Sequence, residues 1–554
     1  MKMFLSRSLL CGSVLLWGFG GPAVAVAAER FTIQPYVNAE SSYTDNLFLS
    51  EENAEADIVS VVTVGIAATA ETRTSGFRVD YRLGLSQYRR FSENDGLRHE
   101  LASDIWWDLS RKDRLEFIGR ARVTEDPEED PFRFAETRAD DFAPDLGDVR
   151  AETVRRTRNR YLQGDATLRY VRRFGPGDSV TLAYRRDFLR NEDRTIRNRE
   201  AHSPSVILRF WPVPDRLFVD AAVDYLREDV EDAIGDPGYF EERIRPSVSL
   251  TYWILPRQFS LRGGIDYMRG VAWDNALVIE PGERLPDNWY ESLAPSIGFS
   301  YRWIPRRMEF EGEISRQRAI TFGDDGLSDA ADDFETWTGR LAVTRFLSRD
   351  LEIFGDYTYS RTDFFRDDGG NENYSVQGPS LGFRSRMAED IPIQFAIGYL
   401  LREREISGRE GAFTLNGSAG QWEFAKDATL RFDVSSGYTE SNLGAERLGF
   451  GFYYDAQLNL GYRFDPYWTA DAGAYYRKNR FLDYEDRTDP TGETRDDRIL
   501  EYRAGLSYRM RTWLFFRLGY AFRDVSATDE VDDYSENRVT FQMGVSPPRP
   551  WRIE

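Results

Sequence analysis

Apolar and polar residues alternate at every second position along most of the chain, from Phe31 almost to its end. The segment "FRVDYRLGLSQYRRF" carries apolar side chains at alternate positions from Phe77 to Leu85, with charged or polar ones between them. The segment "GFGFYYDAQLNLGYRF" repeats this pattern from Phe450 to Tyr462. A period of two puts successive side chains on opposite faces of a β-strand. No helical period persists over a comparable length, so the pattern predicts an all-β protein.

The connections between the predicted strands alternate between two kinds. Short ones often combine an aromatic residue, a proline and an arginine, as in "YRWIPRRM" and "YRFDPYWT". Long ones are polar and acidic, as in "TFGDDGLSDAADDFE" and "EDRTDPTGETRDD". Short turns that alternate with long loops are typical of an up-and-down transmembrane antiparallel β-barrel, with the turns in the periplasm and the loops outside the cell.

The number of short turns sets the number of strands. Eleven turns join twelve hairpins and predict about 24 strands, within a range of about 20 to 26. No change in composition marks a second domain, so residues 29–546 form one predicted barrel, followed by a short tail at 547–554. The turns are centred near residues 73, 112, 176, 213, 256, 305, 348, 389, 426, 465 and 511.

Two features favour a bilayer over a soluble β-protein. Apolar faces of about ten residues match a tilted membrane-spanning strand, whereas soluble strands usually have about five or six residues. Aromatic rings recur beside the short turns, where a membrane barrel has its interfacial girdle. In a soluble stack of sheets the same rings would belong to the core. The tryptophans predicted for the girdle are Trp211, Trp253, Trp303, Trp468 and Trp513.

If the apolar face meets lipid, the opposite face lines the lumen and carries charges of both signs. Such charges would be costly in a dry core but not in a wet lumen. They can order polar solutes and bond sugar hydroxyls, or they can only keep the lumen hydrated and fix the strand register. Glu309, Glu311 and Glu313 form a row whose members repel one another unless a neighbouring strand supplies arginines. The predicted pore-lining residues are Arg78, Asp80, Arg82, Glu100, Asp104, Asp108, Arg120, Arg122, Asp165, Arg169, Glu309, Glu311, Glu313, Arg340, Asp455, Arg503 and Arg517.

The composition agrees with this interpretation. The chain has 554 residues, 30% of them charged and 14% aromatic, and its mean hydropathy is −0.55. Beyond the first thirty residues no apolar run is long enough for a membrane helix, whereas a barrel dilutes its apolar belt with a polar lumen and loops. The formal charge of −21 argues against nucleic acid bound through a basic field.

The first 28 residues have the pattern of a cleaved secretory signal. Lys2 and Arg7 precede the apolar stretch "LLCGSVLLWGF", and a region of small residues ends near Ala28. Cleavage would remove Cys11, the only cysteine, and leave no disulfide and no thiolate metal site. With the barrel pattern, this signal predicts the outer membrane of a Gram-negative bacterium.

Few residues suit catalysis or metal binding. His99 and His202 fall near the outer ends of strands, where outer-membrane hydrolases use a histidine, but no diagnostic Ser/His/Asp spacing accompanies them. The segment "DDGLSDAADD" lacks the spacing of a calcium loop. We therefore predict no catalytic residue, no metal and no cofactor. Strand patterning from Phe31 leaves no room for the plug of a siderophore transporter, while residues 125–158 are long enough to form a constriction.

A string near the start of the mature chain carries a family resemblance. Tyr43 begins "YTDNLFLS", and a β-branched strand follows from Asp57. Over roughly the first 60 mature residues the chain resembles the outer-membrane β-barrel porin type 2 family, although Val64 stands where that family often has a proline. The resemblance implies an outer-membrane component of exopolysaccharide or capsule systems. Such barrels often end on an aromatic that the assembly machinery reads, and Phe541 or Trp551 would take that place here.

The sequence thus predicts a passive outer-membrane conduit for a polysaccharide or another polar solute. A scaffold barrel of a surface assembly, without an open pore, is the main alternative, and an outer-membrane hydrolase is the third. The predicted partners are outer-membrane lipid and lipopolysaccharide, a polysaccharide, periplasmic export proteins and the barrel assembly machinery.

Overall fold

The computed structural model describes residues 30–125, 158–193, 196–231, 239–274, 288–303, 307–322, 333–365, 372–387, 391–406, 408–441, 449–481, 495–526 and 533–553. The predicted signal and nearly all of the 125–158 loop lie outside these residues. Within the described part of the chain, no helix has the length and apolar character needed to cross a membrane.

Almost all described residues belong to long β-strands, joined in one case by the short 3-10 helix η1 (Ser92–Asn94). The strands are β1 (Arg30–Thr44), β2 (Asp57–Glu71), β3 (Ser75–Tyr88), β4 (Gly96–Asp108), β5 (Asp113–Thr124), β6 (Tyr161–Gly175), β7 (Asp178–Asn191), β8 (Arg199–Val213), β9 (Leu217–Val230), β10 (Tyr239–Leu255), β11 (Phe259–Asp274), β12 (Asn288–Trp303), β13 (Met308–Phe322), β14 (Phe334–Phe346), β15 (Leu351–Phe364), β16 (Tyr374–Met387), β17 (Ile391–Arg404), β18 (Gly408–Ala425), β19 (Ala428–Ser441), β20 (Gly449–Arg463), β21 (Trp468–Phe481), β22 (Arg495–Arg511), β23 (Leu514–Ser526), β24 (Tyr534–Val545) and the short β25 (Trp551–Ile553).

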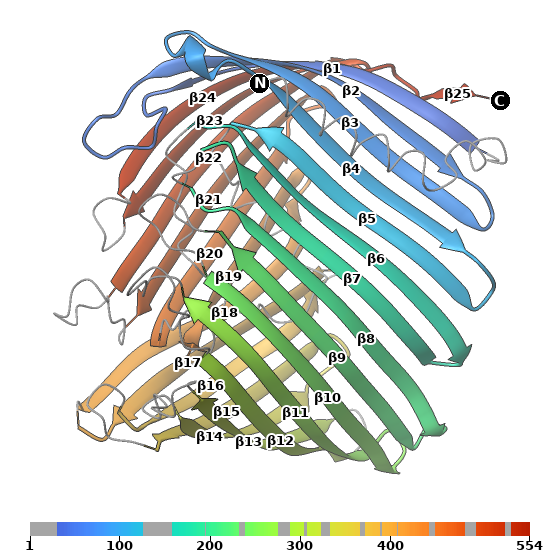
Figure 1. The fold of residues 1–554 in the computed structure, drawn as a ribbon, viewed down its shortest axis with the longest axis vertical. Helices are drawn as coiled ribbons and strands as arrows, with labels where there is room; N and C mark the ends of the chain where they lie inside the picture. Colours follow the sequence, from blue (N-terminus) through green and yellow to red (C-terminus); the bar gives the residue numbers. More distant parts are fainter. Residues whose placement is uncertain are drawn as a thin grey trace, which may run out of the picture.

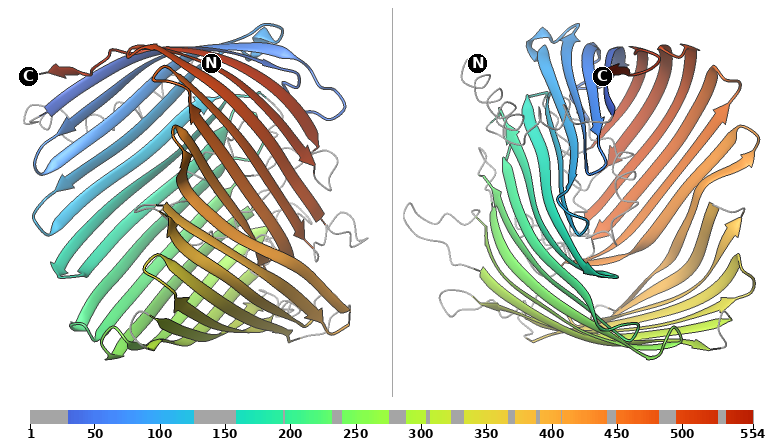
Figure 2. Two further views of the ribbon diagram at one scale, coloured as in Figure 1. Left: turned by 180° about the vertical axis from the view of Figure 1, so that it is seen from behind. Right: turned by 90° about the vertical axis from the view of Figure 1, so that its right-hand side faces the viewer.

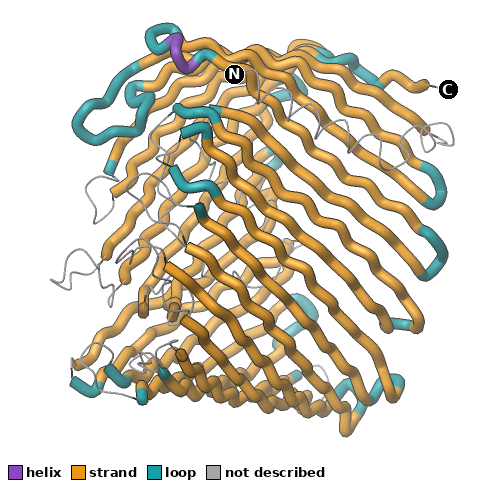
Figure 3. The backbone as a smooth tube through the Cα atoms, viewed as in Figure 1, coloured by secondary structure: helices purple, strands orange, loops and turns teal. Residues whose placement is uncertain are grey.

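These strands form one closed antiparallel barrel. Each of the 24 long strands pairs with the next along the chain, and β1 also pairs with β24 (Figure 1). The strands tilt steeply across the wall, as the trace in Figure 3 shows. The fold predicted from the alternation, an up-and-down barrel of about 24 strands, is confirmed. All eleven short connections, from β2–β3 to β22–β23, lie at one end, the short-turn end; the opposite end is the long-loop end.

The outer face of the wall carries the apolar side chains of the alternating pattern. Ile297, Leu381 and Val64 are 63%, 61% and 55% exposed, and neighbouring strands add many more exposed aliphatic and aromatic side chains. A soluble protein rarely exposes a continuous apolar surface of this extent. Side chains on a convex wall also diverge, which explains their exposure. The outer face is therefore suited to contact with lipid.

The 24 long strands have between 12 and 18 residues, more than the ten or so that span a bilayer. The extra residues lie toward the long-loop end and carry outward-facing charges. Arg227 and Arg269 are examples, and they lie over the rings of Phe240 and Trp289 respectively. The apolar pattern alone did not predict this extension.

The two ends of the chain close the barrel side by side. β24 pairs with β1 from Val545 opposite Val37 to Arg538 opposite Thr44. After a break at residues 546–550, β25 pairs with β1 again, with Ile553 opposite Phe31. The tail expected at 547–554 thus continues the pairing of β24 along β1 (Figure 1).

At the junction between β18 and β19, two neighbouring strands pair over only part of their length. β18 pairs with β17 up to Gly408, but its pairing with β19 stops at Gly417 opposite Val434. Residues 408–416 of β18 and 435–441 of β19 have no backbone pairing with each other in the described register. We call this divergence the seam. It lies at the long-loop end, and the strands on its two sides, gold and orange in Figure 2, diverge there.

Candidate functional site

Away from the long-loop end, the charged side chains share the face that alternates with the exposed apolar residues, and this is the inner face. On the concave side of a barrel, side chains converge and can meet across an intervening strand. Tyr36 of β1 reaches Asp80 of β3, and Arg517 of β23 reaches Asp471 of β21, in each case past one strand. The register places all the predicted pore-lining residues on this face, for example Arg82 opposite Glu100. Their role in an open pore remains a prediction.

A network of hydrogen bonds and ion pairs joins β1, β3 and β4 on the inner face. The hydroxyl of Tyr36 donates to Asp80 Oδ1 at 2.6 Å, and Arg82 Nε donates to that hydroxyl at 2.8 Å. Arg82 also pairs with Glu100 at 3.1 Å. Gly65 of β2 makes this bridge possible, because a Cβ there would lie 2.2 Å from the Tyr36 ring. The network thus ties the first four strands together.

A second network lies on β4, β5 and β6. Glu116 accepts a hydrogen bond from Arg169 and pairs with Arg114 at 2.7 Å. The Arg114 guanidinium lies 4.9 Å from the centroid of the Trp106 ring. Arginines held between carboxylates and rings keep a fixed orientation, so this part of the wall presents ordered charge.

The three-glutamate row on β13 is only partly compensated. Glu309 accepts a hydrogen bond from Arg302 Nε at 3.1 Å. Arg340 stands opposite Glu313 in the register, yet it donates to Asp356 of β15 at 2.7 Å. In the part of the chain that the structure describes, Glu311 and Glu313 have no ion pair. The inner face therefore has a free acidic patch, defined by Glu311 and Glu313.

The last quarter of the barrel repeats the cross-strand bridging. Arg503 donates to Asn459 Oδ1 at 2.7 Å, past β21. The Tyr475 hydroxyl donates to Asp455 Oδ2 at 3.0 Å on the neighbouring strand. Both signs of charge, amides and aromatic hydroxyls thus alternate around the inner face.

The predicted girdle tryptophans fall into two groups. Trp303 and Trp513 are 51% and 43% exposed, and Trp468 stacks on Tyr508 of the outer face. Trp211 and Trp253 instead have inner-face register and stack on each other, with centroids 5.2 Å apart, past β9. The alternation in the sequence was enough to separate the two groups. Trp211 and Trp253 each follow an inner-face residue, Arg209 and Thr251 respectively, by two positions. The girdle itself remains a prediction.

Both histidines lie on the outer face in matched settings. His99 Nδ1 is 2.9 Å from the Tyr81 hydroxyl, and His202 Nδ1 is 2.6 Å from the Tyr184 hydroxyl. Ser203 follows His202 in the strand and therefore points to the opposite face. This geometry gives no support to a Ser–His pair and weakens the hydrolase alternative.

Residues 43–50 form hydrogen bonds across the junction at which β1 and β24 close the barrel, a role that sequence reasoning missed. We call these contacts the closure latch. Asn537 of β24 donates to Asp45 from its backbone N–H and its Nδ2, both at 2.8 Å. Asn46, only 1% exposed, donates to the carbonyls of Ser50 and Ser535 at 2.7 and 2.9 Å. In the same loop, Phe48 packs edge-on against Phe91.

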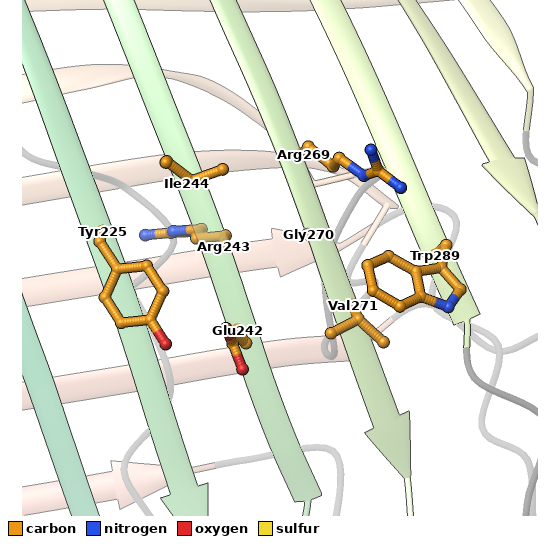
Figure 4. A pocket seen from close by; sticks show the side chains of 8 residues that line it. All are labelled: Tyr225, Glu242, Arg243, Ile244, Arg269, Gly270, Val271 and Trp289. Atoms are coloured by element: carbon orange, nitrogen blue, oxygen red, sulfur yellow. The ribbon is translucent and has the colours of Figure 1, made fainter.

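A shallow pocket lies outside the barrel wall. Its side chains of outer-face register come from β9 to β12 at the long-loop end, and Figure 4 shows Tyr225, Arg269 and Trp289 around it. It does not belong to the inner face. Among the described residues, no group of three or more His, Cys, Asp or Glu side chains could hold a metal ion.

No family model matches the chain, and no curated protein matches it. Among solved structures, it is similar to the FrpB iron transporter from Neisseria meningitidis, at 10% identity over 95% of this chain and 83% of that one, with a TM-score of 0.50. It also matches the ferric-catecholate import receptor Fiu from E. coli K12, at 10% identity over 92% and 81%, with a TM-score of 0.49. The siderophore receptor PirA from Pseudomonas aeruginosa matches at 10% identity over 93% and 80%, with a TM-score of 0.44.

At this identity, the likeness to FrpB shows the fold alone. The chain is a large transmembrane β-barrel of the architecture found in outer-membrane transport proteins.

Proposed function

We propose that the protein is an outer-membrane conduit for polar solutes, with an extracellular polysaccharide as its cargo. The short-turn end faces the periplasm and the long-loop end faces outside, as in other bacterial barrels. The observation that carries this proposal is the chemistry of the inner face. Charges of both signs are held in fixed pairs there, beside aromatic hydroxyls and rings.

A sugar chain needs hydrogen-bond donors and acceptors for its hydroxyls and flat apolar surfaces for its ring faces. The Tyr36–Asp80–Arg82 network supplies donors and acceptors at fixed positions. The stacked pair Trp211 and Trp253, near the short-turn end, supplies an apolar surface. The resemblance of residues 43–50 to the porin type 2 family supports an exopolysaccharide or capsule system as the setting.

The main alternative is a scaffold barrel that anchors a surface assembly without conducting. The purified protein in planar bilayers separates the two. A conduit gives stable ohmic current steps, and a scaffold gives none.

The choice of cargo needs a second experiment. A deletion strain should lose or reduce its surface glycan, and re-expression should restore it. Normal glycan export in the deletion strain would exclude a polysaccharide as the cargo. The conduit would then carry another polar solute. Periplasmic export proteins and the assembly machinery are the partners expected in that setting.

A further inference from the structure

A cluster at the seam joins two faces that a continuous wall would keep apart. Phe450 and Phe452 alternate in phase with Leu458 and Leu460 of β20, which are about 40% exposed on the outer face. Their own exposure is only 1% and 7%. They pack with Tyr374, Val376 and Leu400, which have inner-face register on β16 and β17.

The separation along the sheet makes this contact informative. β16 and β20 are four strands apart, so in a continuous wall they would be roughly 19 Å apart at about 4.8 Å per strand. The Tyr374 and Phe450 ring centroids are 5.9 Å apart, and the Ser360 and Tyr438 hydroxyls, on β15 and β19, are 3.4 Å apart. At the long-loop end, the tips of β19 and β20 therefore lie inside the layer formed by β15 to β18.

A buried arginine holds this overlap from the β17 side. The Arg402 guanidinium lies 4.4 Å from the Tyr374 ring centroid and 4.2 Å from that of Phe450, and the residue is 2% exposed. Glu410 lies 3.9 Å from it. A desolvated cation between two rings stabilises the packed arrangement.

The register also defines a second arrangement that the same strands can form. Continued from Gly417 opposite Val434, it would set Leu415 opposite Ser436 and Phe413 opposite Tyr438. Three further hydrogen-bonded pairs between β18 and β19, with two bonds in each pair, would add about six backbone hydrogen bonds. Phe413 is 73% exposed and packs edge-on against Tyr399 of β17, and in the described register no residue of β19 stands opposite it.

Ser436 marks the point at which pairing would resume. Its Oγ accepts from the backbone N–H of Leu415 at 2.7 Å and donates to the Leu415 carbonyl at 3.2 Å. The Ser436 N–H donates to Asn416 Oδ1 at 3.1 Å. Hydrogen bonds from these side chains thus replace the missing backbone pairs and hold β18 and β19 together at the point where the two strands diverge.

We propose that the seam is a switch with an overlapped state, seen in the structure, and a zipped state in which β18 and β19 pair along their full length. In the zipped state Phe450, Phe452 and Tyr438 face lipid, an apolar setting that suits them as well as the cluster does. On going from the overlapped to the zipped state, the contacts of Arg402 with the two rings are lost and backbone hydrogen bonds between β18 and β19 are gained. Two packings of one sheet that differ by such compensating terms form a bistable element.

The switch changes the width of the barrel at the long-loop end. Overlap removes about four of 24 strand spacings from the circumference there, so zipping enlarges the enclosed cross-section roughly 1.4-fold. In a conduit, this change sets the size of solute that passes. The effect on passage rests on the proposed conduit function, whereas the rearrangement of the strands does not.

A cysteine pair tests the rearrangement directly. Cys11 is the only native cysteine, so Phe413→Cys with Tyr438→Cys in a Cys11→Ser background gives a clean cross-link. Facing residues of paired strands have Cα atoms about 5.5 Å apart, within the range that a disulfide spans. The folded barrel in detergent is oxidised with copper–phenanthroline, and the cross-link is read as a gel shift that dithiothreitol reverses. Phe413→Cys with Ser41→Cys on the distant β1 is the control for collisional cross-linking.

We expect a cross-link in the test pair only, forming several-fold faster when Arg402→Ala is added. Faster cross-linking from Arg402→Ala but not from Arg402→Lys assigns the effect to the guanidinium stack. Retained gel mobility of the unheated protein shows that each variant folds. No cross-link above the control, with or without Arg402→Ala, would overturn the switch.

Conductance then tests the effect on width. The oxidised protein should conduct about 1.4-fold more than the same protein after reduction, and equal conductance would overturn the assigned effect on the lumen. If no form conducts, wild type included, the conduit proposal fails, and the switch is judged by cross-linking alone.

Discussion

Asn46 offers the sharpest test of the closure latch, through the isosteric change Asn46→Asp. Its Nδ2 donates to the carbonyls of Ser50 and Ser535, and its Oδ1 accepts from the Ser50 N–H at 2.9 Å. The substitution keeps the shape but replaces the double donor with a carboxylate oxygen that faces two carbonyl oxygens in a buried site.

The magnitude follows from these contacts. Two lost hydrogen bonds contribute about 1 kcal/mol each, and burial of an unsatisfied charged group adds about 1–3 kcal/mol. The free energy of unfolding should therefore fall by roughly 3–5 kcal/mol. The cost should shrink in acid: burial raises the folded-state pKa of the introduced carboxyl, so the folded state binds the proton more tightly and stability rises as pH falls.

The measurement is equilibrium unfolding by urea in detergent micelles at pH 7.5 and pH 4.5. Asn53→Asp is the matched control, because Asn53 is exposed in the same loop and its side chain has no hydrogen bond in the described structure. Equal unfolding free energies for the two variants at pH 7.5 would refute the latch.

Two further predictions concern the inner face. Gly65→Ala should lower the free energy of unfolding by about 1–3 kcal/mol in the same urea assay, because the added Cβ would overlap the Tyr36 ring. Gly339→Ala is the control and should be neutral, since nothing lies within 4 Å of its added Cβ. Equal effects of the two substitutions would contradict the Tyr36–Asp80 bridge past β2. Trp211→Ala with Trp253→Ala should weaken current block by a neutral linear oligosaccharide several-fold without changing the open conductance, and unchanged block would remove the stacked pair from the sugar path.

The strict alternation of the sequence was enough to predict the barrel, its short turns and the shared face of the predicted pore-lining residues. Each of these features depends on the two-residue period of the strands and on the residues of the turns, and both are set by residues that are close in the sequence. Arg82 opposite Glu100 is an example, because the two residues lie on the charged face of adjacent strands.

Long-range contacts were beyond that reasoning. The partners of Asn46 include Ser535, 489 residues away, and only barrel closure brings them together. Phe450 and Phe452 have the alternation of lipid-facing residues, and their burial follows from a break in the sheet that no local pattern marks. Arg340 stands opposite Glu313 in the register, but it donates to Asp356 of β15, a choice that the alternation alone does not determine.

The central claim is that the inner face carries the conducting path, and charge reversal at the free acidic patch tests it most directly. Glu311→Lys with Glu313→Lys changes the charge of the inner face by about four units close to passing ions. Glu291→Lys, with Glu242→Lys, makes the same change on the outer face. In planar bilayers under a tenfold salt gradient, the inner-face variant should shift its reversal potential toward anion selectivity, and the outer-face control should match wild type. An inner-face variant with the wild-type reversal potential would contradict the claim.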